Sequence, residues 1–169
     1  LVVSRQLAQA ITQLAPADFG FVFVEIGDLP LYNQDDDANQ ADSVKRMKAE
    51  IAASQGVIFV TPEYNRSIPG VLKNALDHGA RPYGQNVWAG KPAGVIGASM
   101  GAIGTAMAQQ HLRNIVAYLD MPTLNAPETY LKFDDQTVDT HHQFSNEGTR
   151  KFVQSWVDAY VAWVKKIAG

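Results

Sequence analysis

The distribution of apolar residues along the chain predicts an alternation of strands and helices. Two apolar runs, at 57–60 and 93–98, are continuous and rich in small or β-branched residues, as expected of strands buried on both faces of a parallel sheet. A β-branched and aromatic run at 20–26 predicts another strand, and residues 121–124 predict a short last one. Between these runs, apolar residues recur at helical spacing. The predicted helices cover 7–14, 44–51, 69–78, 103–119 and 152–167.

Strict alternation of this kind implies an α/β protein with helices on both faces of a parallel sheet. Right-handed crossovers leave few topologies, and five strands fit the order 2-1-3-4-5. A length of 169 residues suits one domain, spanning residues 1–169. In such a sheet a ligand lies beyond the carboxyl ends of the strands, so the segments after residues 60 and 98 are the ones to inspect.

The first residues do not fit this scheme smoothly. Leu1, Val2 and Val3 have the character of the end of a buried strand, yet Ser4 follows with no turn residue before the predicted helix. A strand usually reaches a helix through a connection of about 2–6 residues. We therefore expect residues to be missing before Leu1 and between Val3 and Ser4, so that the first strand and its following loop are incomplete.

Composition narrows the function classes. Hydrophobic residues make up 46% and charged residues 18%, which excludes a disordered or low-complexity chain. A formal charge of −3 without a basic patch argues against a nucleic-acid partner. No apolar run has the length of a membrane helix, so no membrane partner is expected. The absence of cysteine excludes thiol catalysis and cysteine-ligated metal, and is consistent with a cytoplasmic location.

The segment 61–70 leaves a predicted strand and enters a predicted helix, with two prolines to stiffen it. Tyr64 suits a position against a flat aromatic ligand, and Asn65 offers both a donor and an acceptor. Ser67 is a candidate helix cap, and backbone N–H groups near a helix start favour negative charge. The same residues are equally compatible with a rigid turn that binds nothing.

The segment 97–105 is rich in glycine and also joins a strand to a helix. It lacks the lysine of a phosphate-binding P-loop and the glycine spacing of a dinucleotide fingerprint. It does contain the G-x-S-x-G pattern of a nucleophile elbow, which makes a serine esterase using Ser99 an alternative. Acids and bases follow in hydrolase order: Asp120, Asp134 or Asp135, then His141 or His142. A third interpretation is that the small residues of this segment only allow close packing of the helix against the sheet.

No metal site is expected, since Asp35–Asp37 and His141–His142 have the character of solvated segments.

Several motifs, taken together, are similar to those of one family. They are 28–33 (Asp-Leu-Pro-Leu-Tyr-Asn), 62–65 (Pro-Glu-Tyr-Asn), 67–77 (Ser-Ile-Pro-Gly-Val-Leu-Lys-Asn-Ala-Leu-Asp), 81–82 (Arg-Pro), 90–92 (Gly-Lys-Pro), 99–101 (Ser-Met-Gly) with Gly104, and 111–113 (His-Leu-Arg). The chain resembles the NADPH-dependent FMN reductase family, and within it the bacterial chromate and quinone reductase branch. The similarity spans nearly the whole chain.

The resemblance implies a flavodoxin-like three-layer sandwich, a non-covalently bound FMN cofactor and a homodimer or homotetramer. In the family, the Pro-Glu-Tyr-Asn loop borders the isoalloxazine ring, which assigns Pro62, Glu63, Tyr64 and Asn65 to the cofactor site, with Ser67 beside them.

The loop after the fourth strand approaches the other edge of the ring in this family, which assigns Ser99, Met100 and Gly101. The family holds the FMN phosphate with a Gly-Ser-x-Arg-x-x-Ser-x-Asn loop after the first strand. That loop is absent here, and Ser4 is read as its last trace.

The implied function is transfer of hydride from NADPH or NADH through flavin to a small-molecule acceptor, such as a quinone, chromate, an azo compound or free flavin. Because the cofactor supplies the chemistry, no side chain is assigned as catalytic. A non-enzymatic flavodoxin-type electron carrier is a second alternative, although a charge of −3 is modest for one. Arg66 and Arg81 suit the extra phosphate of NADPH and equally suit solvent, so the sequence leaves the preferred donor open.

Overall fold

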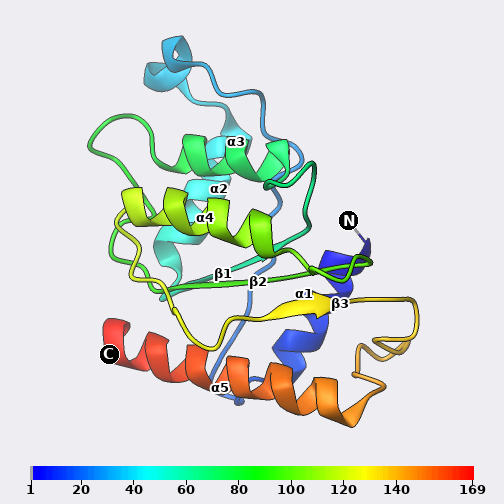
Figure 1. The fold of residues 1–169 in the computed structure, drawn as a ribbon. Coiled ribbons are helices and arrows are strands. Elements are labelled where there is room, and N and C mark those ends of the chain that lie inside the picture. The colour runs from blue at the N-terminus through cyan, green and yellow to red at the C-terminus, as the bar shows by residue number, and fades with distance from the viewer. Residues whose placement is uncertain (1) are drawn as a thin grey trace.

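The computed structural model describes residues 2–169, and Figure 1 shows its helices and strands. In chain order the elements are α1 (Val2–Leu14), the 3-10 helix η1 (Gln34–Asn39), α2 (Asp42–Ala53), β1 (Val57–Thr61), α3 (Gly70–Gly79), β2 (Ala93–Ser99), α4 (Ala106–Tyr118), β3 (Tyr130–Lys132) and α5 (Glu147–Ala168). Each predicted helix is present, and α1 and α5 begin earlier than the apolar spacing predicts.

The three strands form one parallel sheet in the order β1-β2-β3. β1 pairs with β2 from Val57↔Ala93 to Thr61↔Gly97, and Gly97 also begins the pairing of β2 with β3 at Tyr130. This order matches the last three strands of the predicted topology. The prediction of five strands is wrong for residues 2–169, in which only these three segments form strands.

The side chains of β2 alternate between two hydrophobic clusters, as the two-residue period of a strand requires. Ile96 and Ala98 pack with α1 and α5, whereas Ala93 and Val95 pack with residues of α2, α3 and α4. Figure 1 accordingly shows α1 and α5 on one side of the sheet and the other helices on the opposite side. The expected three-layer sandwich is therefore present, and burial on both faces explains why β2 is apolar throughout.

The predicted strand at 20–26 is wrong. This segment is extended but forms no strand, and Val22 and Phe23 are 74% and 57% exposed. A β-branched composition favours an extended backbone, but a strand also needs a neighbour to complete its hydrogen bonds. Within residues 2–169, β1 pairs with β2 alone, so the segment at 20–26 does not extend the sheet.

The predicted strand end at the start of the chain is also wrong for the described residues. Val2 and Val3 belong to α1, which continues through Ser4. Leu7 and Ile11 of this helix are fully buried against the sheet, and their spacing continues back through Val3. Within the described residues, the apolar run at the start of the chain thus belongs to an amphipathic helix. Leu1 lies outside the described residues.

The last predicted strand is displaced along the chain. At 121–124 there is a single bridge, between Thr123 and Ala93, and the pairing with β2 resumes only at β3. The intervening residues leave the sheet and include Pro127, which has no N–H to donate. β3 was missed because three residues, Tyr-Leu-Lys, carry too little apolar pattern to mark a strand.

Helix α5 closes the face of the sheet that α1 shares. The side chain of Asn146 accepts a hydrogen bond from the N–H of Thr149, which caps the start of the helix before its first apolar residue. Trp156, Val157 and Tyr160 form its buried stripe, with the rings of Trp156 and Tyr160 stacked. No helix within residues 2–169 is both long and apolar enough to cross a membrane.

Candidate functional site

Two connections meet at the carboxyl edge of the sheet. β1 ends at Thr61 and β2 passes the same level at Gly97, because these two residues are register partners in neighbouring parallel strands. The turn 62–69, which follows β1, and the loop 100–105, which follows β2, therefore leave the sheet side by side. In Figure 1 the helices that they enter, α3 and α4, run next to each other from this edge. This is the position at which α/β sheets bind ligands.

The turn 62–69 is built around a two-residue hairpin. Tyr64 and Ser67 exchange backbone hydrogen bonds, with N–H to oxygen distances of 2.9 and 3.0 Å. Asn65 and Arg66 between them have φ of 50° and 67°. Two central residues with positive φ are typical of the type I′ turn, which is tight and fixed in shape. The ring of Tyr64 is 50% exposed, while Pro62 lies partly buried at the end of the strand.

This turn is fastened to helix α4. The Glu63 carboxylate accepts the N–H groups of Met107 and Ala108, at 3.1 and 3.2 Å, and so caps a helix whose own N-cap residue, Thr105, makes no side-chain cap bond. The Ser67 hydroxyl lies 2.9 Å from Nδ1 of His111, one turn further along the helix. Sequence reasoning assigned Glu63 to the cofactor and missed both contacts, because each joins residues 44 positions apart.

The expected helix starts are not where the sequence placed them. Ser67 does not cap α3, because Pro69 occupies the N-cap position and Gly70 begins the helix. The first N–H groups of α4 are used by Glu63, so they are not free to stabilise negative charge on a ligand. What the turn offers a ligand is its own backbone and the exposed side chains of Tyr64, Asn65 and Arg66.

The loop after β2 folds back on itself. The Ser99 hydroxyl donates to the carbonyl of Gly104 and lies 3.3 Å from that of Gly101. Gly104 has φ of 65°, and a Cβ there would come within 3.0 Å of the backbone of Tyr130, so only glycine fits. Met100 is 75% exposed at the tip and, with Tyr64, gives this edge of the sheet two accessible apolar side chains.

The esterase alternative is not supported by this geometry. The hydrogen of Ser99 is directed at backbone carbonyls, and no histidine is bonded to it. His141 and His142 lie in the loop before α5, where Asp139 accepts the N–H of His141 and the His141 carbonyl accepts from Gln13. Among residues 2–169 there is also no group of three or more acidic or histidine side chains that could hold a metal ion.

Ser4 is not part of a loop, as the sequence reading had it, but sits in the first turn of α1. Its side chain is buried and its hydroxyl oxygen has no hydrogen-bond partner in the described part of the chain. Figure 1 places the N-terminal end of α1 on the side of the sheet toward which β3 points, which is the edge that carries the turn 62–69. An unpaired buried hydroxyl in the first turn of a helix suits an anionic group, because the first N–H groups of a helix are also unpaired. Ser4 and the two apolar side chains thus fit a ligand with a flat ring and a phosphate.

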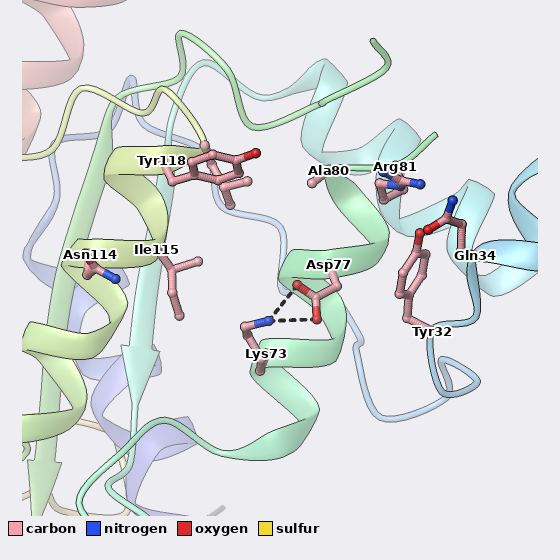
Figure 2. Close-up of a pocket in the computed structure, with 10 residues that line it drawn as sticks. Tyr32, Gln34, Lys73, Asp77, Ala80, Arg81, Asn114, Ile115 and Tyr118 are labelled. Atoms are coloured by element: carbon pink, nitrogen blue, oxygen red, sulfur yellow. Dashed lines mark hydrogen bonds and ion pairs between the residues drawn. The ribbon is translucent and has the colours of Figure 1, made fainter. Parts of the chain in front are cut away.

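A separate cavity of about 550 Å³ lies between α3 and α4, away from both connections (Figure 2). Lys73 and Asp77 form an ion pair at 2.8 Å on one wall, and Ile115 and Tyr118 line the other. Tyr118 is 89% exposed at its mouth. None of the residues predicted from sequence to bind FMN lines this cavity, although Arg81, which was considered for the extra phosphate of NADPH, does.

Comparison with known proteins identifies the relatives of this chain. The sequence pattern that defines the NADPH-dependent FMN reductases matches residues 3–136. The chain belongs to the NADPH-dependent FMN reductase family. The resemblance inferred from the motifs is confirmed, and with it the expectation of an NAD(P)H-dependent flavin enzyme at the level of the family.

Curated members of this family share much of the sequence. A 2-hydroxy-1,4-benzoquinone reductase from Burkholderia sp is 53% identical over 162 residues, which are 96% of this chain and 88% of the relative. A quinone reductase from Pseudomonas putida is 47% identical, over 96% of this chain and 87% of the relative. These relatives are reductases, which favours neither an esterase nor a non-enzymatic carrier.

Solved structures support the flavodoxin-like fold of the family. FerB, a flavoenzyme NAD(P)H:(acceptor) oxidoreductase from Paracoccus denitrificans, matches with a TM-score of 0.95 at 42% identity, over 99% of this chain and 92% of FerB. An oxidoreductase from Corynebacterium diphtheriae matches with a TM-score of 0.65 at 13% identity, which shows a shared fold alone.

Proposed function

We propose that this protein is an FMN-dependent NAD(P)H oxidoreductase that reduces quinone-type acceptors. Membership of the family supports the cofactor and the donor, and the two reductase relatives support the acceptor class. The observation on which the site depends is the fixed turn 62–69 beside the loop after β2. A rigid, pre-formed slot with apolar walls is what a flat ring needs.

Six residues at the two connections are proposed to contact the ring of FMN. Pro62, Tyr64 and Asn65 would border one edge with their backbone and with the exposed ring of Tyr64. Glu63 and Ser67 hold this turn in place through α4. Ser99, Met100 and Gly101 would approach the other edge, and Ser4 would bond to the phosphate.

Bound FMN would supply the hydride-transfer chemistry between the nicotinamide and the acceptor. The chain's own part is to bind and orient. Tyr64 and Met100 exclude water from the ring edges, and the amide of Asn65 can donate to or accept from heteroatoms there. The Ser99 hydroxyl, whose hydrogen is already directed at Gly104, can only accept. No acid or base of the chain is assigned to the transfer.

The proposal extends to the context in which the enzyme works. Residues 1–169 form one FMN-binding domain that associates as a homodimer or homotetramer in the cytoplasm, where NADPH and NADH are produced. The exposed Tyr118 beside the cavity between α3 and α4 supports a subunit contact, because large exposed apolar side chains around a groove are typical of interfaces. Chromate, azo compounds and free flavin are further proposed acceptors, since an open ring face does not select strongly among them.

Titration of the purified protein with FMN tests the core of this proposal. We expect the flavin fluorescence to be quenched and the yellow cofactor to remain with the protein on a desalting column. Tyr64→Ala should weaken FMN binding about tenfold, corresponding to the roughly 1.4 kcal/mol of one aromatic contact. Tyr83→Ala, which removes an exposed ring of the same size outside both connections and outside the cavity, is the matched control. A protein that binds no FMN at micromolar concentration would refute the function.

A further inference from the structure

The hairpin at the tip of the turn carries an unusual residue. In two-residue turns with positive φ at both central positions, asparagine is favoured at the first and glycine at the second. Asn65 follows this rule, but the second position, with φ of 67°, is occupied by Arg66. A side chain with a Cβ is strained in this region of backbone conformation. Strain of this kind at an exposed loop tip points to a function for the side chain that causes it.

Within the described part of the chain, Arg66 also differs from the other arginines in having no side-chain partner. Arg81, the other residue considered for the extra phosphate of NADPH, is committed to Asp37 at 3.1 Å. Each of the remaining arginines has at least one side-chain hydrogen bond or ion pair: Arg5, Arg46, Arg113 and Arg150. Within residues 2–169 the exposed Arg66 makes neither an ion pair nor a side-chain hydrogen bond. Its guanidinium is therefore available to a ligand.

The position of Arg66 limits which ligand this is. It lies between Asn65 and Ser67 on the turn that borders the proposed ring site, and the nearest acidic residue of that turn, Glu63, is occupied with the N–H groups of α4. A planar guanidinium binds phosphate through two parallel hydrogen bonds. NADPH carries a 2′-phosphate that NADH lacks, and both deliver their nicotinamide to this edge of the sheet if the proposed function holds.

We propose that Arg66 binds the 2′-phosphate of NADPH and makes this enzyme prefer NADPH to NADH. The inference rests on the proposed function and adds the residue that selects the donor. It also accounts for the strained turn, since glycine at this position would relax the backbone and lose the phosphate contact.

Arg66→Gly tests the assignment without endangering the fold, because glycine suits the backbone at this position. With the FMN-loaded enzyme, we expect kcat/KM for NADPH to fall about 10- to 100-fold, as for loss of a charge-assisted hydrogen bond. The value for NADH should stay within about twofold, the range expected for a surface charge that does not touch NADH. For Arg66→Lys, kcat/KM for NADPH should lie between the values of the wild type and of Arg66→Gly. Lys151→Ala, which removes an exposed positive charge on α5, is the matched control.

A binding measurement separates this inference from the function itself. Calorimetry should show that the wild type binds 2′,5′-ADP more tightly than 5′-AMP, and that Arg66→Gly binds both equally. An unchanged ratio of kcat/KM for NADPH to kcat/KM for NADH in the folded variant would overturn the assignment. If that ratio were unchanged and FMN binding were weaker, Arg66 would instead bind the phosphate of FMN. If the wild type oxidises neither donor, the proposed function fails, while the nucleotide-binding comparison still decides whether Arg66 binds a 2′-phosphate.

Discussion

The carboxylate of Glu63 caps helix α4 by accepting the N–H of Met107 at 3.1 Å. Glu63, in the turn after β1, thus provides the side-chain cap that Thr105, the N-cap residue of α4, does not provide. The turn and the helix are held together as one unit beneath the proposed ring site, and the shape of the site depends on this contact.

Glu63→Ala should therefore destabilise the protein even without cofactor. Loss of a helix cap costs about 1 kcal/mol, and the helix start also loses a favourable charge. Urea unfolding of the FMN-free protein measures the change, since bound cofactor would add its own stabilisation. Glu63→Gln keeps an acceptor oxygen and should lose less. Glu128→Ala, an exposed glutamate with only a 3.5 Å contact to Gln110, should change little. Equal effects of Glu63→Ala and Glu63→Gln would argue against a cap.

Gly97 of β2 lies against Thr61 of β1 and Thr105, the N-cap residue of α4. A Cβ at this position would collide with the side chain of Thr105 and with the carbonyl of Thr61, which is backbone and cannot move aside. Gly97→Ala should cost about 1–3 kcal/mol or more through overpacking. At Gly101, a few residues on, a Cβ would meet nothing closer than the Ser99 hydroxyl at 3.6 Å.

Gly101→Ala is therefore the matched control for Gly97→Ala. Thermal unfolding midpoints of both variants measure the effect. Gly97→Ala should lower the midpoint, and Gly101→Ala should leave it nearly unchanged. Similar losses of stability in the two variants would contradict the packing argument.

The loop before α5 should be sensitive to acid through Asp139. Its carboxylate accepts the N–H of Gln143 at 2.9 Å and that of His141 at 2.8 Å, and these bonds lower the pKa of Asp139 below its ordinary value of 3.8. A pKa lower in the folded state than in the unfolded state stabilises the fold above the ordinary value, and this stabilisation is lost as pH falls through the lowered one.

Asp139→Asn keeps an acceptor oxygen but has no charge to lose. The difference in unfolding midpoint between the wild type and this variant should be largest near neutral pH. It should shrink as pH falls below about 3.8, the ordinary value that applies in the unfolded state, and vanish below the lowered pKa of the folded state. Unfolding curves recorded from pH 7 to pH 2.5 measure it. Two profiles that stay parallel over the whole range would exclude this role of Asp139.

Self-association is expected to depend on Tyr118. Tyr118→Asp places a charge at the mouth of the cavity between α3 and α4, and burying an unpaired charge in an interface is costly. Light scattering after size exclusion should show the assembly of the wild type and a smaller species for the variant. Tyr83 is 91% exposed but does not line the cavity, so Tyr83→Asp is the control. Loss of assembly in both variants, or in neither, would place the contact elsewhere.

Much of the fold could be predicted from sequence because burial leaves a pattern. β2 is covered on both faces and is apolar throughout, and α5 shows its stripe of Trp156, Tyr160 and Val164. The segment 20–26 has the same composition as a strand, but whether a neighbouring strand is present is not encoded in the segment itself. β3 is too short to show a period at all.

The candidate site was predictable in part. Its two connections follow from the positions of β1 and β2, because parallel strands end at one edge. The task of Glu63 was not predictable, since it depends on a helix 44 residues away. The strain at Arg66 was not predictable either, because the backbone angles of a turn depend on how its neighbours are held.

The extended segment 20–26 has a practical consequence for handling this protein. Phe-Val-Phe-Val-Glu-Ile combines high β-propensity with one charge and no proline, and its outward residues Val22 and Phe23 meet solvent rather than a neighbouring strand in the described chain. Such stretches recruit copies of themselves into intermolecular sheets when the protein is concentrated. We therefore expect concentrated solutions of the protein to aggregate through this segment. Phe23→Lys should raise the protein concentration at which aggregation begins.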